Sequence, residues 1–172
     1  AINTIGPTIM QFGTAAQKSD LLPRILRGEL HFGVGYTESG SGTDLASLTT
    51  RAVCDGDDYV IDGQKIFTTH AQDADYIWLA TRTNADVPKH EGISMLAIDL
   101  KTPGIRVDPM HLLSEHDINT VFFDDVRVPV TTVVGKENQG WRLITSQLNH
   151  ERVTLCSAGL LAQAYEETVA WT

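Results

Sequence analysis

The sequence has little of what marks several large classes of protein. Cys54 and Cys156 are the 2 cysteines among 172 residues, and their wide separation excludes a disulfide framework and a CxxC zinc motif. Lysines and arginines number 13 against 22 acidic residues, giving a net charge of −9. No stretch approaches the ~20 apolar residues of a membrane span. We therefore expect neither a nucleic-acid partner nor a transmembrane segment.

The six histidines are scattered, and none shows the HExxH spacing that places two imidazoles on one helical face. We predict no metal site. The two separated cysteines favour a reducing, cytoplasmic setting. Both ends of the chain are expected to lie inside a longer protein, because Ala1 follows no initiator Met or leader and Thr172 falls within a predicted helix.

Hydrophobic periodicity predicts an α+β fold in three parts. Residues 1–30 are expected to hold two short helices, with Gly13 and Pro23 as breaks. Residues 31–135 change to a period of two, and no amphipathic helix separates the strands, which favours an antiparallel β-sandwich or barrel over a parallel βαβ sheet. Residues 136–172 predict one long helix from near Gln139 to the end. Strands are expected around Val53, Tyr59–Ile61, Tyr76–Ala80, Ser94–Ile98 and Thr120–Phe123.

The loop at residues 36–44, with the sequence YTESGSGTD, is rich in glycine and hydroxyl groups. Such a loop can direct several N–H and O–H groups at an anion without supplying a full charge. A Rossmann assignment fails because no third glycine follows at the required spacing, and a P-loop fails because Gly-Lys-Ser/Thr is missing. From the residues alone, the loop is either a ligand cradle or a simple turn.

This loop resembles the TEPGxGSD signature of the acyl-CoA dehydrogenase family, which cradles flavin and the pantetheine of a thioester. The sequence departs from that signature at Ser39, where the family has proline, and at Thr43, which replaces serine but keeps a hydroxyl. The resemblance implies that Tyr36, Thr37, Gly42 and Thr43 bind FAD and that Thr43 also contacts the acyl-CoA.

A second resemblance to the same family lies at residues 62–71, with the sequence DGQKIFTTHA. It implies that Phe67 packs near the flavin ring and that Thr69 hydrogen-bonds near its hydride-accepting nitrogen. Packing and a few fixed donors are what such a ring needs. Phe67 could otherwise be an ordinary strand-core residue. His70 replaces the family's asparagine and Thr68 an aliphatic residue, and we assign neither a role.

Residues 122–129 and 134–141 are similar to the family's passage from its last strand into a long helix, and residues 12–29 to its lead-in. The resemblance therefore covers nearly the whole chain. It implies the end of an N-terminal helical domain at 1–30, a middle β domain that binds FAD and acyl-CoA at 31–135, and an incomplete C-terminal helical domain at 136–172.

Removal of a proton α to a thioester needs a carboxylate within hydrogen-bond reach of that carbon. In some branches of the family, this base is a glutamate on the long helix just before an arginine, and that pair matches Glu151 and Arg152. In many other members, the base lies beyond the end of this chain. From its residues alone, Glu151 could be a solvated surface residue and Arg152 a salt-bridge partner, but the resemblance implies a catalytic base and a substrate-organising residue.

The resemblance implies α,β-dehydrogenation of an acyl-CoA with FAD as cofactor and an electron-transfer flavoprotein as acceptor, in a homo- or hetero-oligomer whose subunits share the FAD site. Residues 148–152 and 118–123 are similar to a bacterial branch that handles steroid side-chain thioesters as mixed two-subunit tetramers. Two alternatives stay open. One is an acyl-CoA oxidase or flavin monooxygenase on the same scaffold, and the other is a non-catalytic subunit that supports a partner's active site.

Overall fold

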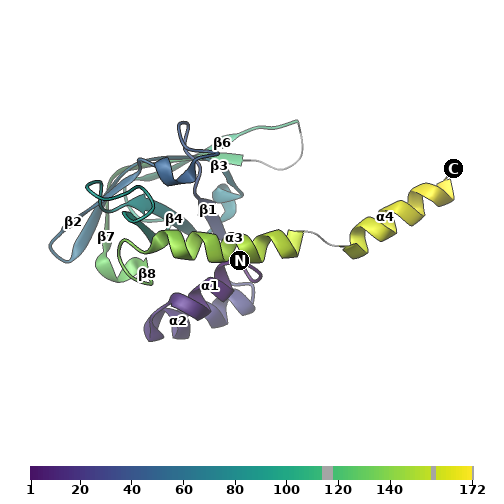
Figure 1. Cartoon of the computed structure of the whole chain (residues 1–172), viewed down its shortest axis with the longest axis horizontal. Coiled ribbons are helices and arrows are strands. Elements are labelled where there is room, and N and C mark those ends of the chain that lie inside the picture. Colours follow the sequence, from purple (N-terminus) through teal and green to yellow (C-terminus); the bar gives the residue numbers. More distant parts are fainter. Residues whose placement is uncertain (114–117, 156–157, 172) are drawn as a thin grey trace.

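The computed structural model describes residues 1–113, 118–155 and 158–171. A β-sheet forms the body, three helices pack against it, and a fourth stands apart (Figure 1). The helices are α1 (Ile5–Phe12), α2 (Ala15–Leu26), α3 (Gly140–Leu155) and α4 (Ala158–Trp171). The strands are β1 (Phe32–Gly35), β2 (Arg51–Asp55), β3 (Asp58–Thr69), β4 (Tyr76–Arg82), β5 (Ile93–Asp99), β6 (Ile105–Met110), β7 (Ile118–Pro129) and β8 (Val133–Val134). Short 3-10 turns are η1 (Leu45–Ser47), η2 (Ala71–Asp73) and η3 (Val130–Thr132).

The strands form one sheet in the order β6-β7-β3-β2-β4-β5-β8, with β1 attached to β4. Most neighbours run antiparallel, which confirms the predicted α+β class with a β-rich middle. The antiparallel arrangement has two parallel pairings within it: β1 runs parallel to β4 from Phe32↔Tyr76 to Gly35↔Leu79, and Arg51 of β2 pairs in parallel with Arg82 of β4. Parallel neighbours need a crossover connection. The β2–β3 hairpin provides it between β1 and β4, and the sheet is therefore mixed.

Strands β4 and β5 form the centre of the body because both of their faces are buried. Trp78 and Ala80 face a core shared with the helices, whereas Ile77 and Leu79 face a second core. Strands buried on both sides have continuous apolar runs rather than alternation, which explains the sequence of β4. The helical core also includes Ile5, Ile9, Leu21, Ile25, Leu143 and Ile144, and the second core includes Tyr59, Ile61, Leu96, Ile98, Val121 and Phe123.

Helix α2 is fastened to the sheet by its first turn. The Thr14 hydroxyl accepts a hydrogen bond from the Gln17 backbone N–H, and the Gln17 side-chain oxygen accepts one from the Thr14 N–H, forming a capping box. The Gln17 Nε2 donates to the carbonyls of Thr131 and Val133, each at 2.9 Å. The two short predicted helices are confirmed, but Pro23 lies inside α2 rather than ending it.

The single long helix predicted from near Gln139 corresponds to two described helices, α3 and α4, and residues 156–157 between them lie outside the described residues. Helix α3 begins at Gly140, where an added Cβ would lie 2.8 Å from the Ile93 carbonyl oxygen. Glycine therefore allows the helix to start directly against β5. Helix α4 buries none of its described residues and extends away from the body (Figure 1).

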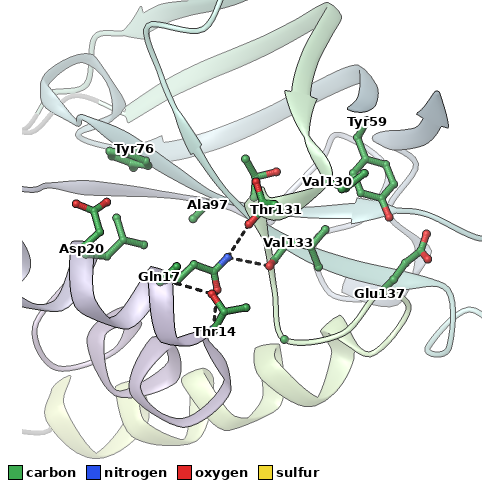
Figure 2. A pocket seen from close by; sticks show the side chains of 14 residues that line it. Thr14, Gln17, Asp20, Tyr59, Tyr76, Ala97, Val130, Thr131, Val133 and Glu137 are labelled. Atoms are coloured by element: carbon green, nitrogen blue, oxygen red, sulfur yellow. Dashed lines mark hydrogen bonds between the residues drawn. The ribbon is translucent and has the colours of Figure 1, made fainter. Parts of the chain in front are cut away.

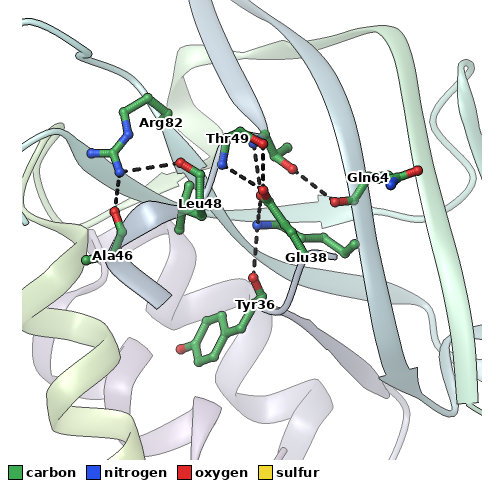
Figure 3. Close-up of polar contacts among 9 residues, drawn as sticks. Tyr36, Glu38, Ala46, Leu48, Thr49, Gln64 and Arg82 are labelled. Atoms are coloured by element: carbon green, nitrogen blue, oxygen red, sulfur yellow. Dashed lines mark hydrogen bonds and ion pairs between the residues drawn. The ribbon is translucent and has the colours of Figure 1, made fainter. Parts of the chain in front are cut away.

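A buried ion pair joins the loop after β1 to strand β3. Lys65 is fully buried, and its Nζ donates to the Glu38 carboxylate at 2.8 Å and to the Tyr36 carbonyl at 3.1 Å. The same carboxylate accepts from the N–H and hydroxyl of Thr49, each at 2.7 Å, and from the N–H of Thr50 at 2.9 Å (Figure 3). A buried charge costs several kcal/mol unless it is paired and hydrogen-bonded, and this pair meets both conditions.

The partners of Glu38 keep it ionised. Burial raises the pKa of its carboxyl, but the Lys65 ammonium and the N–H donors of Thr50 and Thr49 outweigh burial and hold that pKa at about 2. Burial lowers the pKa of Lys65, and the charge of Glu38 opposes that shift. The pair is therefore a fixed electrostatic link at neutral pH.

We predict that Glu38→Gln lowers the free energy of unfolding by about 3–5 kcal/mol, because it leaves the buried Lys65 ammonium without a counter-charge. Glu38→Gln/Lys65→Met should recover part of this loss. Urea unfolding of the wild type, both single variants and the double variant measures the coupling. Equal stability of wild type and Glu38→Gln would contradict the prediction.

The stability of the wild type should also fall as the pH drops from 4.5 towards about 2. A lowered folded-state pKa stabilises the folded state only while the carboxyl is ionised.

Candidate active site

A pocket of about 660 Å³ opens where the ends of β1 and β3 meet η2 and α3, and we call it the β1–α3 pocket. Its lining comes from separate parts of the sequence and includes five residues predicted to bind a ligand or act on one: Tyr36, Thr37, Phe67, Thr69 and Glu151. The remaining lining residues are Ala1, His31, Phe32, Val34, His70, Asp73, Ala74 and Leu148. The fold thus brings the predicted base and four of the predicted cofactor residues to one cavity.

Strand β1 forms one wall of this pocket through its alternation. Phe32 and Val34 line the pocket, whereas Gly33 and Gly35 are buried on the other face of the strand. An added Cβ at Gly35 would lie 2.8 Å from the Ile77 side chain, so glycine allows β1 to approach β4 closely. We assigned no role to Phe32 or Val34 from the sequence, although the alternating pattern FGVG was a usable signal.

Phe67 reaches the pocket because β3 bulges at this point. Lys65 pairs with Val121 and Thr68 with Asn119, so β3 carries one more residue than β7 between these pairs. Phe67 has a φ of 58°, and its side chain is 57% exposed. The alternative that Phe67 is an ordinary core residue is therefore wrong. A left-handed conformation costs a non-glycine residue roughly 1–2 kcal/mol, and such outliers cluster at functional sites.

Two threonines place hydroxyl groups at the same pocket. Thr37 is half-buried, and its carbonyl accepts a hydrogen bond from the Ile66 N–H at 2.9 Å, which ties the loop to the bulged strand. Thr69 is exposed at the end of β3. Within the part of the chain that the structure describes, neither hydroxyl makes a hydrogen bond, so both can serve a ligand.

Glu151 enters the pocket from α3, near Tyr36. Its side chain is half-buried, and its charge contributes to the local environment of the Tyr36 hydroxyl. Burial raises the pKa of Tyr36, a hydrogen bond from Trp78 opposes this shift, and the charge of Glu151 raises the pKa further. Tyr36 is therefore a neutral phenol. Glu151 brings a carboxyl group to the pocket from α3, and Asp73 brings one from η2.

Three predicted site residues lie outside the pocket lining. Gly42 and Thr43 are exposed on the turn that follows Ser41. An added Cβ at Gly42 would meet only Thr37, at 3.9 Å, so packing within the chain does not require glycine there. Arg152 is exposed on α3, one residue beyond Glu151. The predicted residues therefore divide into those that line the pocket and three exposed residues outside its lining.

A second cavity, of about 640 Å³, lies between α2 and the β5–β8 edge of the sheet (Figure 2). Tyr59 and Glu137 stand at one end of it, and Asp20 and Tyr76 at the other (Figure 2). Burial and the neighbouring Glu137 raise the pKa of Tyr59. None of the predicted cofactor or catalytic residues lines this cavity, so it is separate from the β1–α3 pocket.

The β1–α3 pocket fits a flat aromatic cofactor with polar edges, such as flavin. It offers the exposed ring of Phe67, the apolar side chains of Phe32 and Val34, and the hydroxyls of Thr37 and Thr69. Its volume falls within the ~300–1,000 Å³ of typical ligand sites. Among the described residues, no cluster of three metal-ligating side chains and no helix long and apolar enough to cross a membrane occurs.

Comparison with known sequences gives matches over most of the chain. Residues 33–126 match the family model for the acyl-CoA dehydrogenase middle domain, and residues 138–172 match the model for the acyl-CoA dehydrogenase C-terminal domain. Acyl-CoA dehydrogenase FadE29 of Mycobacterium tuberculosis is 55% identical over 171 residues, which cover 99% of this chain and 44% of that protein. FadE26 of the same organism is 50% identical over 173 residues, with coverages of 99% and 43%.

Solved structures give the same result. The Tcur3481-Tcur3483 steroid ACAD superimposes with a TM-score of 0.94 at 51% identity, covering 99% of this chain and 44% of the matched one. The ChsE4-ChsE5 complex from Mycobacterium tuberculosis gives 0.82 at 53% identity, with coverages of 87% and 39%. The chain thus spans less than half the length of these relatives. Because the middle-domain model alone matches more than half of its residues, the chain belongs to the acyl-CoA dehydrogenase family.

Proposed function

We propose that the protein containing this chain is an FAD-dependent acyl-CoA dehydrogenase that forms a double bond between the α and β carbons of an acyl-CoA thioester. Family membership supports this general reaction. The observation that carries the proposal is that Glu151 lines the same pocket as Phe67 and Thr69. Proton and hydride leave neighbouring carbons in this reaction, so the base and the cofactor must meet in one pocket.

The proposed cofactor residues fall into two sets, one that lines the β1–α3 pocket and one outside it. FAD, when bound, supplies the acceptor for the hydride that leaves the β carbon. We assign Tyr36, Thr37, Phe67 and Thr69 to holding the cofactor at the β1–α3 pocket, with the exposed Phe67 ring as the apolar contact. Gly42 and Thr43, on the exposed turn, are assigned to cofactor binding outside that pocket, and Thr43 also to the thioester.

Glu151 is proposed to accept the α-proton. A carboxylate serves as a general base only within hydrogen-bond reach of that proton, and a half-buried position on the pocket wall provides such access. Arg152 lies roughly 100° further around the helix and is exposed. We assign it to organising the substrate at the rim, because a guanidinium forms ion pairs and does not exchange protons near neutral pH.

We further propose a steroid side-chain thioester as substrate and an assembly of two kinds of subunit. The support is that one solved relative above 50% identity is described as a steroid ACAD and the other as a two-component complex. Electrons would then leave to an electron-transfer flavoprotein. We place the enzyme in the cytoplasm, a reducing compartment consistent with the free, exposed thiol of Cys54.

The first test is an anaerobic acyl-CoA titration of the full-length protein with its partner subunit. We predict that wild-type flavin absorption bleaches and that Glu151→Gln fails to bleach while retaining FAD, because the amide cannot accept the α-proton. Removal of a general base typically costs about 10²–10⁴-fold in rate. Glu91→Gln, at an exposed position outside the pocket, is the matched control and should bleach like wild type.

The other outcomes of this titration are informative. Equal bleaching by wild type and Glu151→Gln would move the base to a residue beyond this chain. Absence of bleaching with linear, branched and steroid thioesters would contradict the dehydrogenase proposal and favour a non-catalytic subunit. Rapid reoxidation of the reduced flavin by air rather than by an electron-transfer flavoprotein would favour an oxidase or monooxygenase.

We predict that Phe67→Ala weakens FAD binding about tenfold in the full-length protein, since it removes the exposed apolar contact. The midpoint of urea unfolding of the apoprotein should change little, because the Phe67 side chain is 57% exposed. Val53→Ala, at a residue 55% exposed on β2, is the matched control and should leave the FAD dissociation constant unchanged. Undiminished FAD affinity in Phe67→Ala would remove Phe67 from the proposed cofactor site.

We also predict that the 172-residue chain on its own retains little FAD and turns over no thioester, because subunits of the proposed assembly share the cofactor site. Gel filtration with flavin absorption measures the retained cofactor, and circular dichroism checks that the sheet is folded. Stoichiometric flavin in the folded fragment would show that this chain alone is sufficient for binding.

A further inference from the structure

Three buried polar side chains form a chain of hydrogen bonds behind the β1–α3 pocket. The Trp78 indole Nε1 donates to the Tyr36 hydroxyl at 3.1 Å, and that hydroxyl donates to the Gln147 Oε1. Trp78 and Gln147 are fully buried, and Tyr36 is 7% exposed. These residues come from β4, the loop after β1, and α3. The bonds therefore connect the centre of the sheet to the helix that carries Glu151.

The direction of each bond is fixed by chemistry. An indole N–H can only donate, so the Tyr36 oxygen must be its acceptor. The phenol proton is then available for Gln147, and only the carbonyl end of that amide can accept it. The amide of Gln147 therefore has a single orientation, with Oε1 towards Tyr36. Burial keeps the Tyr36 hydroxyl protonated by raising its pKa, so this donor persists at neutral and alkaline pH.

Tyr36 is held at two points. Its carbonyl accepts from the buried Lys65 Nζ at 3.1 Å, and its hydroxyl is held by Trp78 and Gln147. The next residue, Thr37, lines the pocket. The Lys65 bond and the polar chain together therefore fix the start of the loop after β1 relative to β3, β4 and α3.

Gln147 lies one helical turn before Glu151 on the same face of α3, since residues four apart on a helix are neighbours. Its Nε2 is buried and has no hydrogen-bond partner among the residues that the structure describes. An apolar side chain of this size would avoid the cost of burying an amide. The buried amide therefore lowers the stability of the fold. Its directional hydrogen bond to Tyr36, however, fixes the rotation of α3 about its axis and its position along that axis, which apolar packing specifies less strictly.

We propose that Gln147 is a positioning residue, which through its bond to the Tyr36 hydroxyl holds Glu151 in register with the cofactor side of the β1–α3 pocket. This inference rests on the proposed function, in which Glu151 is the base. Gln147 itself does not line the pocket, so it acts through α3 and not by contact with substrate.

The test uses Tyr36→Phe, Gln147→Met and the double variant in the full-length protein with its partner subunit. Each single variant removes the Tyr36–Gln147 bond while keeping a similar shape, and Tyr36→Phe also removes the acceptor of the Trp78 N–H. We expect kcat to fall on the order of tenfold in each, because the loss of this buried hydrogen bond leaves Glu151 less firmly positioned. KM for the thioester should change less than twofold. The double variant should be no slower than Tyr36→Phe, because the Tyr36–Gln147 bond is already lost in that single variant.

A second readout does not depend on activity. Amide hydrogen exchange over residues 148–153 should quicken in Gln147→Met, while exchange in β4 stays unchanged. Ser146→Ala is the matched control, because Ser146 is the preceding residue on α3 and hydrogen-bonds Gln11 of α1 instead, at 3.3 Å. It should alter neither kcat nor exchange at residues 148–153.

Additive losses in the double variant, or unchanged exchange at residues 148–153 in Gln147→Met, would overturn the positioning role. Failure of the proposed function would look different, because wild-type flavin would then not bleach with any thioester. In that case, the exchange experiment alone decides whether Gln147 holds α3 in place.

Discussion

The buried pair of Glu38 and Lys65 is the interaction on which the arrangement of the pocket depends. Glu38 belongs to the loop after β1, and Lys65 lies two residues before the exposed Phe67 on β3. The same ammonium holds the Tyr36 carbonyl, so one cation fixes both the cofactor loop and the strand that bulges beside it. Because buried charges tolerate little displacement from their partners, the two walls of the β1–α3 pocket keep a constant relation. Glu38, the glutamate of the YTESGSGTD loop, therefore has a structural role in that motif.

Much of the fold could be predicted because its signals are local. The apolar runs of β4 and β5, bounded by turn residues, indicate strands whatever their partners are. The parallel pairing of β1 with β4 could not be predicted, since two strands separated by a hairpin carry no local mark of their direction. Helical periodicity in α4 was also sufficient to predict a helix, yet Leu160, Leu161 and Tyr165 remain exposed there. Hydrophobic periodicity predicts that a segment is helical, whereas burial of that helix also requires a surface for it to pack against.

The site shows the same contrast between features that the sequence predicts and features that depend on tertiary contacts. Family resemblance pointed to Phe67, but only the bulge at Lys65–Thr68 explains how an aromatic residue on a strand turns away from the core. Gly42 and Thr43 were predicted together with Tyr36 and Thr37 because all four belong to one loop that resembles the family signature, whereas only Tyr36 and Thr37 line the β1–α3 pocket. Gln147 carried no signal at all. A glutamine on a helix usually lies at the surface, and its burial follows from the meeting of β1, β4 and α3.

Two-sided burial of β4 and β5 also has a consequence for biosynthesis. One face of these strands is covered by α1 and α2, which the ribosome delivers first, and by α3, which emerges only after β6, β7 and β8. Until α3 has been made, the face of β5 that packs against it lacks part of its cover. Nascent chains with uncovered apolar strands are prone to aggregation and are substrates for chaperones. The order of the elements along the chain therefore leaves one face of β5 vulnerable until α3 has been made.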